Sequence, residues 1–170
     1  VLEHIGYAVK LSPCWPSMRM LVSHGLLDEA TVVARQALDW LKEHAADAQA
    51  VVGIEPSELL AYREEVLDLP LGELHLVTAR EVAAKARLFD EILADTLPQL
   101  QGSYFDSNNR PRRVVVHGHC QQKAAVGMEP TTKALAAIGP DSLSVIPSGC
   151  CGMAGLFGYE REHYELSQKV

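Results

Sequence analysis

The feature that most constrains the fold is an alternation of short apolar runs with longer segments of helical periodicity. Residues 50–54, 114–116 and 143–146 are apolar runs with the length of buried parallel strands. Residues 26–41 instead carry apolar side chains three or four positions apart, which predicts an amphipathic helix with Leu38 on its buried face. Strands that alternate with helices across short loops predict an α/β fold with a mostly parallel sheet.

Two weaker local patterns add predictions. Residues 7–11 alternate faintly and fit a short strand. Thr78 and Glu81 have the spacing of a capping box, with Val77 and Val82 placed as its hydrophobic staple. This second pattern predicts that a helix begins close to residue 78.

Composition excludes several classes of protein. The chain has 170 residues, of which 48% are hydrophobic and 22% charged, so it can bury a core. Its formal net charge of -7 argues against a nucleic-acid partner, which needs a basic face. No apolar run approaches the roughly 20 residues that cross a bilayer, and no signal-peptide pattern opens the chain. We therefore expect a cytoplasmic protein without a transmembrane segment. Because the chain opens without Met and in mid-element, we also expect a fragment.

The strongest chemical signal is the segment Ser-Gly-Cys-Cys-Gly at residues 148–152, directly after a predicted strand. Gly149 and Gly152 permit unusual backbone angles, so the thiols of Cys150 and Cys151 can face one site. Soft thiolates suit iron–sulfur clusters, zinc or copper(I), and adjacent thiolates crowd a single ion but can serve different irons of a cluster. The alternatives are two buried free cysteines that act as small hydrophobes, or a strained vicinal disulfide.

A second signal is His117-Gly118-His119-Cys120 at the end of another predicted strand. Ligands gather at the carboxyl ends of parallel strands, so Cys120 could converge with the cysteine pair. His117 and His119 could be ligands or donate hydrogen bonds to a cluster, but polar strand-end residues satisfied by the backbone are the simpler expectation. Cys14 lies between two prolines, and we expect a packed cysteine there rather than a ligand.

These motifs resemble the cysteine-rich "CCG" domain family over residues 117–123 and 148–164, with looser matches at 25–30 and 51–57. That family includes iron–sulfur subunits of glycolate oxidase, glycerol-3-phosphate dehydrogenase and heterodisulfide reductase. The chain looks most like the version fused behind a flavin-binding dehydrogenase of the D-lactate or 2-hydroxyglutarate type.

The resemblance implies two pseudo-repeated α/β lobes, which we place at 1–97 and 114–170 with a linker at 98–113. It implies that Cys120, Cys150 and Cys151 are metal ligands of a 4Fe-4S cluster in the second lobe. Electrons would arrive from FAD on a partner dehydrogenase domain or subunit through a ferredoxin-like cluster domain. Substrate oxidation would occur on that FAD domain, so no residue of this chain is assigned a catalytic role. Any membrane association would be peripheral and through partners.

The chain also departs from the family pattern. Around Cys14 the first lobe's motif is degraded, and Glu58 stands where relatives often have a cysteine, so we expect no cluster in that lobe. The first lobe would lack its opening strand and the second its closing strand, which would carry a further cysteine beyond Val170. Gln121 replaces a commonly seen His. The alternatives are a thiol- or disulfide-reducing protein like heterodisulfide reductase, or a non-catalytic structural domain whose cysteine site holds zinc or nothing.

Overall fold

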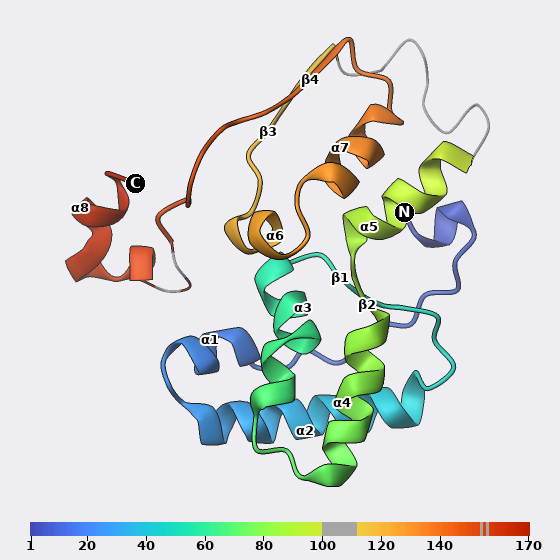
Figure 1. Ribbon diagram of the computed structural model, residues 1–170, viewed down its shortest axis with the longest axis vertical. Helices are drawn as coiled ribbons and strands as arrows, with labels where there is room; N and C mark the ends of the chain where they lie inside the picture. The colour runs from blue at the N-terminus through green and yellow to red at the C-terminus, as the bar shows by residue number, and fades with distance from the viewer. Residues whose placement is uncertain (100–111, 154, 156) are drawn as a thin grey trace. The chain divides into compact units, whose positions relative to one another are not determined.

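The computed structural model describes residues 1–99, 112–153, 155 and 157–170. It divides the chain into two compact units, Val1–Arg87 and Leu88–Val170. Strand β1 pairs with β2, and β3 pairs with β4, so each sheet has two strands, and helices flank both sheets (Figure 1). The predicted α/β class is therefore confirmed.

The division between the units precedes the linker that the sequence suggested at 98–113. Helix α5 (Phe89–Thr96), which we placed in the first lobe, packs against α7 (Glu129–Ala136) of the second unit. This packing puts the boundary between Arg87 and Leu88. Residues 100–111, most of the suggested linker, lie outside the described residues.

The first unit is mainly helical. Its elements in chain order are η1 (Glu3–Ile5), α1 (Met18–Ser23), α2 (Leu27–His44), β1 (Val51–Gly53), α3 (Pro56–Arg63), η2 (Glu65–Asp68), α4 (Glu73–Lys85) and β2 (Ala86–Leu88), which ends one residue past the boundary.

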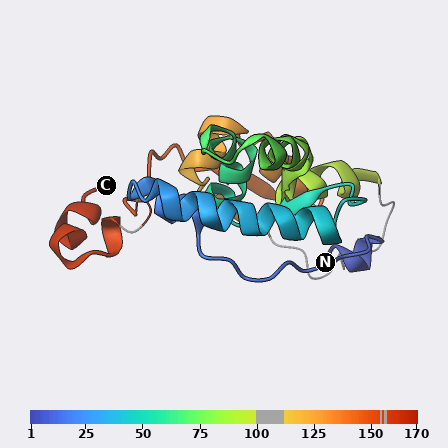
Figure 2. The ribbon, with the colours of Figure 1, turned by 90° about the horizontal axis from the view of Figure 1, so that it is seen from below.

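The core of the first unit is built on α2, as its apolar periodicity predicted. Leu38 is fully buried, and Ala30, Val33 and Ala34 lie on the same buried face. Helices α1 and α4 pack against α2, and α3 packs beside α4 (Figures 1 and 2). Within the described residues, no helix combines the length and the apolar character needed to cross a lipid bilayer.

Two local predictions are wrong. Residues 7–11 form no strand; they are exposed and have no partner strand in the described chain. Thr78 does not start a helix but lies inside α4, buried at 5% exposure. Gly72, with φ of 80°, precedes that helix, and Leu76 N already donates to Gly72 O at 3.0 Å. Helix α4 therefore begins at Glu73, N-terminal to Thr78 and Glu81, whose spacing resembled a capping box.

The second unit contains a parallel strand pair. Its elements are α5, η3 (Leu97–Gln99), β3 (Arg113–Val116), α6 (Cys120–Ala125), α7, β4 (Ser142–Val145), η4 (Phe157–Tyr159), η5 (Arg161–His163) and α8 (Tyr164–Ser167). Strands β3 and β4 run parallel in the register Arg113 to Ser142 through Val116 to Val145. Because α6 and α7 connect them, the unit has the order β-α-α-β (Figure 1).

We predict that Leu38→Asp destabilises the first unit by about 3–5 kcal/mol, because it buries an unpaired charge at a fully enclosed position. Chemical denaturation followed by circular dichroism measures the change. Val32→Asp is the matched control, since Val32 lies on the same helix and is 53% exposed. Equal destabilisation by both variants would show that the helix face is misassigned.

Candidate functional site

The parallel pairing of β3 with β4 brings two cysteine-bearing loops to one edge of the sheet. Val116 and Val145 are the last paired residues, and Ile146 N extends the ladder by donating to Val116 O at 2.8 Å. After β3 the chain runs through three residues into α6, whose first residue is Cys120. After β4 it runs through a short loop to Cys150. Both loops leave the carboxyl ends of neighbouring strands, as the sequence suggested.

The thiols of Cys120 and Cys150 are hydrogen-bonded to each other, and Cys151 is near enough to act on Cys120 electrostatically. The pKa of the Cys120 thiol is raised, first by burial and then by the charge of Cys150. A backbone hydrogen bond from Gln121 opposes this shift. Cys120 and Cys150 are partly buried, whereas Cys151 is exposed. All three predicted thiols therefore lie in one neighbourhood of the second unit.

The two glycines of the cysteine loop have different roles. Gly152 adopts φ of 80°, and a Cβ there would lie 2.6 Å from the backbone oxygen of Ser167. Its N–H also donates to Cys150 Sγ at 3.4 Å. Gly149 has neither a positive φ nor a close neighbour for a Cβ. Only Gly152 is thus required by local geometry, because it combines a left-handed backbone with a close backbone approach.

The histidines differ in exposure. His117 is exposed at the end of β3, and His119 is partly buried at the N-cap of α6. No group of three or more His, Cys, Asp or Glu side chains in the described part of the chain has the geometry to hold one metal ion. A role for either histidine as a ligand stays a prediction.

Lys123 belongs to this site and was missed by sequence reasoning. Its Nζ donates to Ser148 O and to Gly149 O, each at 2.6 Å. These two carbonyls immediately precede the cysteine pair, and Lys123 lies one helical turn after Cys120. That i,i+3 spacing was the available signal, because it places both residues on one side of a helix.

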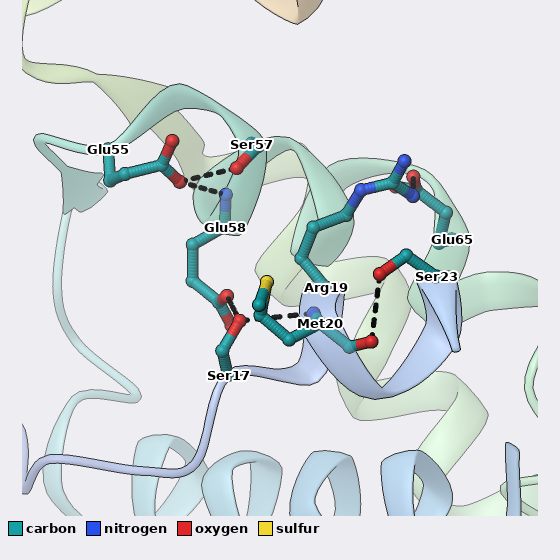
Figure 3. A network of polar contacts seen from close by, with 8 residues as sticks. All are labelled: Ser17, Arg19, Met20, Ser23, Glu55, Ser57, Glu58 and Glu65. Atoms are coloured by element: carbon teal, nitrogen blue, oxygen red, sulfur yellow. Dashed lines mark hydrogen bonds and ion pairs between the residues drawn. The ribbon is translucent and has the colours of Figure 1, made fainter. Parts of the chain in front are cut away.

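Cys14 belongs to the first unit and is exposed in the loop before α1. The expectation of a packed cysteine is wrong, because the Cys14 side chain is exposed. Glu58 and Ser17, also in the first unit, form a polar contact with each other. Ser17 Oγ donates to Glu58 Oε2 at 2.5 Å (Figure 3). Met18 N donates to Glu58 Oε1 at 3.0 Å.

The same network fixes the starts of two helices. Ser17 Oγ accepts from Met20 N at 3.1 Å, which caps α1, and Glu55 accepts from Glu58 N at 2.6 Å, which caps α3 (Figure 3). Burial and the charge of Glu58 raise the pKa of Tyr62. The carboxylates and hydroxyls of this cluster form hydrogen bonds with one another and with backbone N–H groups at the starts of α1 and α3. Their role is therefore structural.

The two units share an order of elements around these positions. In the first unit β1, α3, α4 and β2 repeat the order of β3, α6, α7 and β4. Glu58 lies in the first turn of α3, and Cys120 is the first residue of α6. At the start of the helix that follows the strand, the first unit therefore has the hydrogen-bonded carboxylate of Glu58, and the second unit has the thiol of Cys120.

We predict that Cys150→Ser lowers the pKa of Cys120 in metal-free protein, because it removes a neighbouring negative charge and the thiol hydrogen bond. More Cys120 is then thiolate at pH 8, so iodoacetamide modifies it several-fold faster. Peptide mass spectrometry across a pH series gives the rate, with exposed Cys14 as internal reference. An unchanged pH profile for Cys120 would contradict the contact between the two thiols.

Comparison with known proteins finds D-2-hydroxyglutarate dehydrogenases among the relatives of this chain. The chain is 26% identical to D-2-hydroxyglutarate dehydrogenase of Haemophilus influenzae, over 99% of the chain and 16% of that protein. It is 27% identical to the Escherichia coli protein of the same name, over 98% of the chain and 15% of that protein. The Pseudomonas putida protein of that name is also 27% identical, over 99% of the chain and 15% of its own length.

The chain therefore spans about one-sixth of the length of the curated relatives it matches. No family profile matches it, and no solved structure matches it.

Proposed function

We propose that this chain is the iron–sulfur electron-transfer module of a flavin-dependent 2-hydroxyacid dehydrogenase. The observation that carries the proposal is the gathering of Cys120, Cys150 and Cys151 at the shared edge of β3 and β4. The relatives that align with nearly the whole chain are named D-2-hydroxyglutarate dehydrogenases, which supports this class of substrate.

The donor chemistry fits a 4Fe-4S cluster. Thiolates are the usual ligands of such clusters, and adjacent cysteines can bind different irons where one tetrahedral ion would be crowded. The N–H of Gly152 donates to Cys150 Sγ, a contact of the kind that tunes cluster potentials. The buried Ser148 hydroxyl has no hydrogen-bond partner among the described residues, so it is available to donate to sulfur.

Cys120, Cys150 and Cys151 would hold the cluster, with a fourth ligand from outside this set. The cluster, when bound, supplies one-electron transfer. The chain's own residues supply thiolate ligands, hydrogen bonds to sulfur and partial burial. Because Cys120 has a raised pKa, loading of the site releases a proton and is favoured as pH rises. In this proposal 2-hydroxyacid oxidation takes place on an FAD domain, and electrons reach this module through a ferredoxin-like cluster domain in the cytoplasm.

We predict that Cys150→Ser and Cys151→Ser in the intact protein each abolish cluster binding, because each removes a thiolate ligand. Visible absorption of the protein as purified without oxygen, and the EPR spectrum after dithionite reduction, measure the loss. Cys14→Ser is the matched control and should leave both spectra intact, since Cys14 lies in the first unit.

Equal loss in the Cys14→Ser variant would contradict the assignment of the cluster to the second unit. Intact spectra in the Cys150→Ser and Cys151→Ser variants would contradict the ligand set. Zinc without sulfide in the unsubstituted protein would instead support a structural cysteine site.

A further inference from the structure

The side chain of Lys123 connects the two loops that carry the thiols. Its ammonium group donates to Ser148 O and Gly149 O, both at 2.6 Å. Those carbonyls belong to the loop that leads into Cys150, whereas Lys123 itself lies on α6, one turn after Cys120. One side chain therefore links the helix that carries Cys120 to the backbone beside Cys150.

The path of this side chain is fixed by its surroundings. A Cβ at Gly118 would lie 3.1 Å from Lys123 Cγ and 2.5 Å from Met128 Sδ. The aliphatic stem of Lys123 thus passes over Gly118, beside Met128, where no side chain can stand. A partly buried stem with both ends fixed loses little further freedom on binding, so the ammonium is held in place before any ligand arrives.

Besides the contact between the Cys120 and Cys150 thiols, two further hydrogen bonds of the cysteine loop lie within the loop itself. Ser148 N donates to Ile146 O at 2.8 Å, and Gly152 N donates to Cys150 Sγ at 3.4 Å. These contacts close local turns, whereas the Lys123 contacts join the loop to α6. The ammonium also places a positive charge one residue from Cys150, and a nearby cation favours thiolates and other anionic sulfur groups.

We infer that Lys123 is a positioning residue that holds the Ser148–Gly149 backbone, so that Cys150 stays beside Cys120. The inference has a second part: the charge of Lys123 stabilises the reduced state of the group that these cysteines bind. The second part rests on the proposed function, and the first does not. A fixed positive charge stabilises the more negative, reduced form of a cluster and so raises its reduction potential. A purely structural contact would not change that potential once the cluster is in place.

The test compares Lys123→Met with Lys123→Arg in the intact protein. Lys123→Met keeps the stem and removes the charge and both hydrogen bonds, whereas Lys123→Arg keeps the charge and donors. Redox titration followed by EPR should give a lower midpoint potential for Lys123→Met and a value near that of the unsubstituted protein for Lys123→Arg. Lys133→Met is the matched control, since Lys133 lies on α7 of the same unit and pairs with Asp95 at 4.0 Å. An unchanged potential in Lys123→Met would overturn the electrostatic role.

A second measurement on metal-free protein keeps the positioning role testable if a variant loads no cluster. The thiol oxidant diamide should join Cys120 and Cys150 as a disulfide, with reduction of the diamide and release of two thiol protons to it. Loss of the two Lys123 hydrogen bonds should slow this reaction about tenfold in Lys123→Met, and the rate should recover in Lys123→Arg. Equal rates in all variants would overturn the positioning role. If the unsubstituted protein contains no iron but Lys123→Met still slows the disulfide reaction, the proposed function is refuted and the positioning role of Lys123 is supported.

Discussion

The site depends on the parallel pairing of β3 with β4. The register that aligns Val116 with Val145 makes both strands end at the same edge, and each strand is followed by a loop that carries cysteine. A shift of one residue would turn the side chains of one strand to the other face of the sheet and displace its loop. The contact between Cys120 and Cys150, and the raised pKa of Cys120, follow from this alignment.

The first unit shows what the same order of elements does without thiols at these positions. Glu58 accepts hydrogen bonds from Ser17 Oγ and Met18 N, and the neighbouring Glu55 caps α3. Each oxygen of the Glu58 carboxylate has a donor from the chain itself. Such a cluster needs no bound group to satisfy it, whereas the Ser148 hydroxyl of the second unit has no partner among the described residues. The difference supports assigning ligand binding to one unit and a structural role to the other.

Much of the fold could be predicted because long patterns decide it. The apolar periodicity of α2 covers several turns, so a single exceptional residue does not change the predicted buried face. Leu38 is buried as that periodicity requires. Short patterns fared worse, because Thr78 satisfies a capping rule but lies inside a helix that starts at Glu73. The positions of the thiols could be predicted from the ends of the strands, but the hydrogen bonds of Lys123 to the Ser148 and Gly149 carbonyls could not. Lys123 is an ordinary helix-surface lysine in the sequence, and only the folded chain shows that its ammonium reaches the carbonyls of a distant loop.

The central claim is that the thiols of the second unit hold an iron–sulfur cluster, and metal analysis tests it most directly. Iron, zinc and acid-labile sulfide should be measured on the intact protein purified without oxygen. The account predicts iron and sulfide in equal amounts, with little zinc. Zinc without sulfide, or neither metal, would contradict it and leave the gathered cysteines with a structural role.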